Sequence, residues 1–251
     1  MSFRIRLFAI HLLSSAATLA LVLGSLYAGW YRWPGWYLAM AQTVFLMPAL
    51  VDLVLGPCMT LIIAAPTKPR RELARDIAII ASVQLLALGY GAVSLWNGRP
   101  LYYAFSENML ELVQAYDIDA AEAKLGRASN PALAPHWYSR PRWIWAPLPD
   151  DPQEAQRIVE SAIQGNTDVV GMPRYFKPWS QGSAQLRALL APVAKIRFLG
   201  RDEQQRAAQR MRQQGLSPDE ANAVAFLGRS VRLLAVFDPI TLRLITLVRV
   251  D

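Results

Sequence analysis

The chain is poor in the residues that build metal sites and nucleophilic active sites. Its 251 residues include one cysteine, Cys58, and two histidines, His11 and His136, which are too few and too far apart for a histidine metal site. It contains no P-loop, no G-x-S-x-G motif and no G-x-G-x-x-G fingerprint between a strand and a helix. We therefore predict no metal, no cofactor and no catalytic residues. Because Cys58 lies inside an apolar run, we expect it to pack as a small hydrophobic residue.

Charged residues are also scarce. They make up 18% of the chain, whereas 53% of the residues are hydrophobic and the mean hydropathy is +0.19. This composition excludes a disordered chain and is unusual for a soluble globular protein. Residues 1–100 hold only eight basic and three acidic residues, and the rest hold 18 and 16. No basic patch with interleaved aromatic residues stands out, so the net charge of +7 predicts no nucleic-acid partner.

Three long apolar runs occupy the charge-poor part, at about residues 7–27, 41–64 and 77–96. Each has the roughly 20 residues that a helix needs to cross a ~30 Å hydrocarbon core. The first run is longer than the core of a signal peptide and lacks a small-x-small cleavage site, so we interpret it as a retained helix. The sequence predicts an integral membrane protein with a three-helix transmembrane domain over residues 1–97 and an extracytoplasmic domain over residues 98–251.

The loops predict the orientation of these helices. The N-terminus and the joint after the second run carry six basic residues, whereas the first joint carries only Arg32. This asymmetry places the N-terminus in the cytoplasm. Aromatic residues that favour the membrane interface gather at the opposite ends of the runs: Tyr27, Trp30, Tyr31, Trp33, Trp36, Tyr37 and Trp96. Residues 98–251 then lie outside the cytoplasm, in the periplasm if the host is a Gram-negative bacterium.

Asp52 lies near the middle of the second run, where a carboxylate costs roughly 2.5–3.5 kcal/mol, so it should face protein rather than lipid. Pro48 and the Gly56-Pro57 pair flank it, and we expect each proline to kink the helix and free backbone carbonyls. The partners that we expect at similar depth are Ser14, Ser15, Thr18 and Gln84. We place His11 nearer the cytoplasmic surface, which argues against a His–Asp proton relay. Three roles stay open for Asp52: a hydrogen-bonded staple of the bundle, a contact with another transmembrane segment, or a transport pathway.

The remaining residues indicate an α+β domain. Residues 100–105 and 109–116 favour two short strands around a turn, although 109–116 also suits a helix. Residues 129–152 hold six prolines and predict an irregular crossing, with an edge strand within 142–148. The chain should end in a hairpin around Asp238-Pro239. Helices are expected at 119–127, 152–164, 186–195 and 203–214, with a capping box at Ser217–Glu220 that starts another.

Two segments of this domain carry aromatic and basic residues that suit either recognition or core packing. The first includes Trp137 and Trp143, and the second is residues 171–182. In one interpretation, each segment is a surface that recognises a partner. In the other, each is an ordered connection that covers a small hydrophobic core. The Asp150-Asp151 pair is better explained as a helix start than as a catalytic pair.

The layout resembles the type IV pilin accessory protein family (FimB/TfpZ-like fimbrial assembly proteins). The resemblance is carried by the run Val51-Asp52-Leu53-Val54-Leu55-Gly56-Pro57 with Thr60-Leu61-Ile62, by the basic joint Lys68–Asp76, and by His11, Gln84, Leu88–Gly91, Arg99-Pro100 and Gly228-Arg229. It implies a bacterial inner-membrane protein that modulates pilus assembly or dynamics, and hence twitching motility, without catalytic residues.

The leading hypothesis is therefore a non-catalytic accessory protein that binds the major type IV pilin and contacts other proteins of the pilus machinery. The alternatives are a membrane-anchored periplasmic enzyme that modifies pilin or the envelope, and a ligand-sensing membrane protein. Small residues of the first run, Ser14 to Ala17, suit the close approach of a partner helix. The candidate partner-binding residues are Asp52, Gly56, Pro57, Gln84, His11, Trp137, Trp143 and Arg229.

Overall fold

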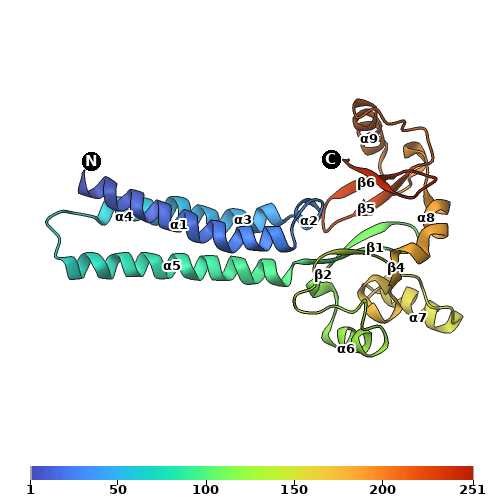
Figure 1. Ribbon diagram of the computed structural model, residues 1–251, viewed down its shortest axis with the longest axis horizontal. Coiled ribbons are helices and arrows are strands. Elements are labelled where there is room, and N and C mark those ends of the chain that lie inside the picture. Colours follow the sequence, from blue (N-terminus) through green and yellow to red (C-terminus); the bar gives the residue numbers. More distant parts are fainter. Residues whose placement is uncertain (1, 251) are drawn as a thin grey trace. The chain divides into compact units, whose positions relative to one another are not determined.

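The computed structural model describes residues 2–250, which form two compact units (Figure 1). The helical unit contains the residues up to 32 and residues 40–98. The sheet unit contains residues 33–39 and the chain from residue 99 onward. A segment between the first two apolar runs is therefore built into the sheet unit.

The helical unit consists of three long helical runs. The first is α1 (Phe3–Gly29) and the third is α5 (Arg70–Asn97). The second is continuous from residue 41 to residue 63 and comprises α3 (Ala41–Leu50), the π-helical segment η1 (Val51–Leu55) and α4 (Gly56–Ile63). All three runs are long and apolar enough to cross a membrane, as the sequence predicts. Pro48 lies inside α3 and Pro57 at the start of α4, and the π-helical turn lies between them.

The outer surface of the helical unit is apolar and its interior contains polar groups. Leu13, Leu21 and Leu86 are among the large side chains exposed on its outside. Asp52, Thr60 and Gln84 are buried within it. This distribution inverts that of a soluble globule, and an exposed apolar surface of this extent marks a membrane or protein contact.

The sheet unit is built on a seven-stranded mixed sheet with the order β4-β3-β1-β2-β5-β6-β7. Two neighbouring pairs, β1·β3 and β2·β5, are parallel, and the other pairs are antiparallel. The strands are β1 (Pro100–Phe105), β2 (Leu110–Gln114), β3 (Arg142–Trp145), β4 (Lys177–Pro178), β5 (Ala223–Leu227), β6 (Arg232–Phe237) and β7 (Leu244–Arg249).

The hairpin of β6 and β7 and the pairing of β1 with β2 follow the prediction. The prediction that 142–148 holds an edge strand is wrong, because β3 lies between β1 and β4. Residues 171–182 supply β4 and two short 3-10 segments, so this stretch is a structured crossing.

Five helices accompany the sheet: α2 (Gly35–Leu38), α6 (Ala120–Ser129), α7 (Pro152–Ile163), α8 (Ser183–Leu189) and α9 (Arg201–Gln213). Asp119 and Asp151 cap α6 and α7, which confirms Asp151 as a helix start. The helix expected at 186–195 is shifted, because the chain turns extended at Leu190 and Ala191 bridges to Ala223. The helix expected from residue 217 is wrong: β5 begins at Ala223 and only a turn precedes it.

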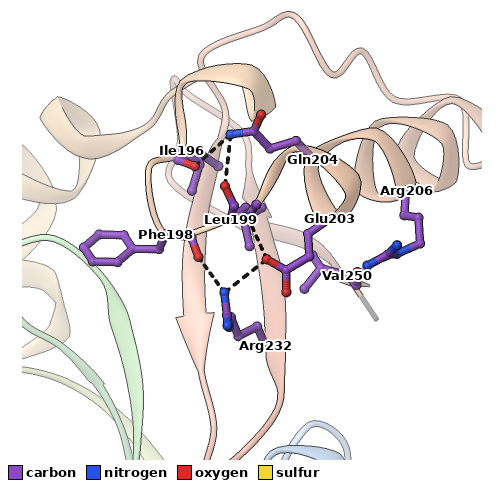
Figure 2. Close-up of polar contacts among 9 residues, drawn as sticks. Ile196, Phe198, Leu199, Glu203, Gln204, Arg206, Arg232 and Val250 are labelled. Atoms are coloured by element: carbon purple, nitrogen blue, oxygen red, sulfur yellow. Dashed lines mark hydrogen bonds and ion pairs between the residues drawn. The ribbon is translucent and has the colours of Figure 1, made fainter.

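Helix α9 is fixed to the sheet by polar contacts at its N-terminus and along one side (Figure 2). The Glu203 carboxylate accepts from the Gly200 N–H at 2.8 Å and pairs with Arg232 at 3.1 Å. Arg232 also donates to the Phe198 carbonyl at 2.7 Å. Arg206 donates to the Val250 carbonyl at 3.2 Å. Glu203 and Arg206 thus tie α9 to the backbone at Gly200 and Val250 and to Arg232 of β6.

The segment 33–39 is held in the core of the sheet unit. Helix α2 places Tyr37 and Leu38 in a cluster with Tyr103 and with residues of β5 and β6. The Leu38 carbonyl accepts a hydrogen bond from the Arg229 N–H at 3.0 Å. A Cβ atom at Gly228 would collide with this same carbonyl, so the close approach requires glycine.

Replacing Leu38 tests whether the segment between the first two helical runs is part of this core. Leu38→Ala should lower the free energy of unfolding by about 2–5 kcal/mol, because the side chain is fully buried. The matched control is Ile240→Ala at an exposed turn residue, which should change it by less than about 0.5 kcal/mol. The two variants are compared by the melting temperature of the detergent-solubilised protein, followed by tryptophan fluorescence. Equal melting temperatures for the two variants would contradict this packing.

Candidate functional site

The candidate site is a buried polar cluster in the helical unit, contributed by all three helical runs. Asp52 (η1), Thr60 (α4) and Gln84 (α5) are 3%, 1% and 6% exposed. His11 and Ser15 of α1 complete it. Buried polar groups of this kind cost free energy unless each one is hydrogen-bonded.

Gln84 is the centre of this polar cluster. Its side-chain oxygen lies 2.7 Å from His11 Nε2, and its nitrogen donates to Ser15 Oγ and to the Asp52 carbonyl, both at 3.2 Å. Because an amide oxygen only accepts, His11 Nε2 must carry the hydrogen. In a neutral His11, Nδ1 then accepts from the Thr60 hydroxyl, 2.5 Å away. One amide therefore joins α1 to the second helical run and to α5.

The π-helical segment explains why Gln84 is needed at this depth. The Gly56 N–H bonds to the Val51 carbonyl, five residues earlier. By the same spacing the Asp52 carbonyl would be paired with residue 57, but Pro57 has no N–H to donate. The amide of Gln84 donates to that carbonyl instead. Gly56 leaves the space for it, because a Cβ atom there would collide with the Gln84 amide.

The Asp52 side chain is less well satisfied than its backbone. Its Oδ1 atom is buried and has no hydrogen-bond partner among the described residues. The side chain lines a cavity of about 160 Å³ between α1, η1 and α5. Ser14, Ser15 and Thr18 border the same cavity, but none of them bonds to the Asp52 side chain among the described contacts, so the sequence prediction of these partners is wrong.

His11 lies closer than Asp52 to the basic joint, which the sequence places in the cytoplasm. It bonds to Thr60, eight residues after Asp52 in the second helical run. Both His11 and Asp52 nevertheless border the one cavity. No direct hydrogen bond joins the His11 and Asp52 side chains among the described contacts.

Two apolar grooves lie elsewhere on the helical unit. A groove of about 500 Å³ between α1 and α3 is bordered by Ala16, Ala20 and Gly24 and by larger residues that include Phe45. A groove of about 470 Å³ between α3 and α5 includes Pro48 and Gly91, whose packing is close. Cys58 is a free thiol exposed on the surface of the helical unit. The described residues contain no cluster of His, Cys, Asp or Glu that could hold a metal ion.

The aromatic candidates of the sheet unit separate into core and surface residues. The Trp143 ring lies 5.1 Å from Tyr103, 5.2 Å from Trp179 and 5.6 Å from Phe226, so it packs against the core rather than forming a recognition surface. Trp137 is 73% exposed. Trp137 therefore remains available for a surface contact, whereas Trp143 does not.

Arg229 borders a cleft of about 550 Å³ that the sequence does not predict. The cleft is lined by residues of β2, of the 165–171 loop and of the turn after β5. These segments are far apart in the chain, and no motif indicates that they lie together. Its carboxylates are Glu111, Asp117 and Asp168, and the Arg229 guanidinium lies 5.6 Å from the Tyr116 ring. Burial raises the pKa of Glu111, the Ser106 hydroxyl 3.0 Å away lowers it, and Asp168 and Asp117 raise it further. Burial also raises the pKa of Asp117.

Replacing Gly56 tests the geometry of the polar cluster. Gly56→Ala should displace the Gln84 side chain and lower the free energy of unfolding by about 1–3 kcal/mol. Gly89→Ala is the matched control on α5, where a Cβ atom meets nothing within 4 Å, and it should be neutral or slightly stabilising. In a Gln84→Ala background the cost of Gly56→Ala should shrink, which a double-mutant cycle measures. Unchanged cost in that background would contradict the collision.

Replacing Glu111 tests the electrostatics of the cleft. Its pKa in the folded protein is raised, so the native state favours the protonated form and stability falls as the pH rises through that pKa. Glu111→Gln should therefore raise the melting temperature at pH 7 and have little effect near pH 4. Asp150→Asn, at an exposed carboxylate, serves as the control. A Glu111→Gln variant that is less stable than the parent at pH 7 and equal to it at pH 4 would show the opposite sign.

Comparison with known proteins gives similarity along nearly the whole chain. Fimbrial assembly proteins of Dichelobacter nodosus, serogroups I and E1, are 24% and 23% identical to it over 254 aligned positions, covering 99% of this chain and 96% of each relative. The fimbrial assembly protein of serogroups C1 and C2 is 28% identical over 46% of this chain and 88% of its own length. No family model and no solved structure matches the chain. The resemblance to fimbrial assembly proteins that the second apolar run indicates is thus confirmed.

Proposed function

We propose that this chain is an inner-membrane accessory protein of the type IV pilus, which assists pilus assembly by binding the major pilin. The observation that carries the proposal is the similarity to two fimbrial assembly proteins over 99% of the chain. The similarity includes both units, so it supports a shared role for the helices and the sheet together. The three apolar helices support a position in the bilayer.

The proposed topology has the N-terminus in the cytoplasm and the sheet unit in the periplasm. Three spans require the joint after the first span and the chain after the third to lie on one side. The packing of residues 33–39 with the residues from 99 onward supports this arrangement. The basic joint between the second and third spans then lies in the cytoplasm, as the positive-inside rule favours.

The proposed role is binding rather than catalysis. A pilin subunit that awaits assembly has its apolar helix in the same bilayer as this chain. The helical unit offers grooves to a neighbouring helix, and the sheet unit exposes Trp137 to the periplasm in this topology. Binding of this kind would hold or present pilin to the machinery that assembles or retracts the pilus.

Photo-crosslinking in native membranes tests the proposal. A crosslinking amino acid at one or more of the exposed positions Leu46, Leu85, Tyr90 and Trp137 should give an adduct with the major pilin, and deletion of the gene should reduce surface pili and twitching. A crosslinker at the exposed Ile163 of α7 serves as the control and should give none. Normal piliation after deletion, together with no pilin adduct from the folded and abundant protein, would refute the proposed function.

A further inference from the structure

We infer that the face between α1 and α5 is the docking site for the pilin helix, which inserts a hydrogen-bond donor beside Asp52. The inference rests on the proposed function and names the face and the chemistry of recognition. Figure 1 shows α1 and α5 running alongside one another within the helical unit. The cavity of about 160 Å³ that Asp52 lines lies between these helices.

The cavity opens sideways to the surroundings of the helical unit. Ser14 and Thr18 at its α1 side are exposed, and Leu85 at its α5 side is 63% exposed. Its volume suits the end of one side chain and not a whole helix. A helix lying along this face would therefore place a single side chain in the cavity, over the small residues of α1.

The cavity has more acceptors than donors, and among the described contacts only the Ser15 hydroxyl hydrogen at its wall has no acceptor. Both donor positions of the Gln84 amide are occupied, by Ser15 and by the Asp52 carbonyl. The hydroxyls of Ser14 and Thr18 donate to carbonyls of their own helix, at 2.9 and 3.0 Å, and present only lone pairs. The Asp52 carboxylate, whose buried Oδ1 is unpaired, accepts no hydrogen bond among the described contacts. The missing group is thus a donor: a hydroxyl, an amide or an ammonium on the partner helix.

The other two grooves lack this chemical requirement. The α1–α3 groove is lined by Ala16, Ala20, Gly24, the exposed Gln42 and apolar side chains, and lipid tails can cover its apolar part as well as a protein can. The α3–α5 groove is mainly apolar too. Among the described residues that line these three sites, only Asp52 has a buried polar atom without a hydrogen-bond partner. A lipid chain would leave that atom unsatisfied, so the α1–α5 face gains most from a polar partner.

Crosslinkers at three positions, one for each face, test the inference: Leu85 (α1–α5), Leu46 (α1–α3) and Tyr90 (α3–α5). A pilin adduct is expected from Leu85 and not from Leu46 or Tyr90. Asp52→Leu should reduce the Leu85 adduct at least about fivefold, which is the scale of one interhelical hydrogen bond in a bilayer. Asp52→Asn keeps an acceptor oxygen, so it should retain most of the Leu85 adduct if the donor on pilin is neutral. Loss of the adduct in both Asp52 variants would identify the donor as an ammonium.

A second variant guards against misfolding of Asp52→Leu. Ser14→Leu fills the exposed rim of the cavity without altering Asp52 and should also remove the Leu85 adduct, while Leu13→Ala on the same helix should not. A Leu85 adduct that survives both Asp52→Leu and Ser14→Leu would overturn the inference. An adduct from Leu46 or Tyr90 alone, or one between two copies of this chain, would overturn it too. A pilin adduct from Trp137 only would overturn it while leaving the proposed function standing.

Discussion

The helical unit depends on one hydrogen bond, from the Gln84 amide to the Asp52 carbonyl. Pro57 removes the N–H that the π-helical spacing would supply to that carbonyl, and an unpaired carbonyl in an apolar interior costs about 1–3 kcal/mol. Gln84 meets the requirement only if α5 lies at one height and in one rotation against η1. Gly56 permits the approach, because any larger residue would collide with the amide.

The same amide fixes α1, since its remaining groups bond to His11 and Ser15. His11 in turn bonds to Thr60 of α4, so the network returns to the second helical run. Between helices in lipid there is no hydrophobic driving force, and close packing with interhelical hydrogen bonds takes its place. A network that is satisfied at Gln84, His11 and Thr60 therefore sets the register of all three helices, and the contact of Gly91 with Pro48 adds close packing.

The sequence predicts what depends on local pattern and misses what depends on contacts. Apolar length gives the three helices, and capping residues such as Asp119 and Asp151 give the starts of α6 and α7. The sequence does not show that β3 pairs with β4 on its outer side, because β4 lies more than 30 residues later in the chain. It also does not show that the residues after 217 form a turn leading into β5. The bonds of Gln84 to His11 and Ser15 depend on how the three helical runs pack, which no local pattern gives. The prolines predict a freed carbonyl near Asp52, but that Gln84 bonds to it is seen only in the fold.

Recognition of one helix among many in a bilayer requires something that lipid cannot imitate. An apolar groove gains little from exchanging a lipid tail for a leucine, so grooves such as that between α1 and α3 discriminate mainly by shape. A polar atom that is buried and unpaired discriminates by chemistry, because only a partner with a donor removes its cost. The hydrogen bonds of Gln84, His11 and Thr60 join the three helical runs around the cavity that Asp52 borders. In the inference drawn above, Asp52 discriminates between partner helices by the donor that each one carries.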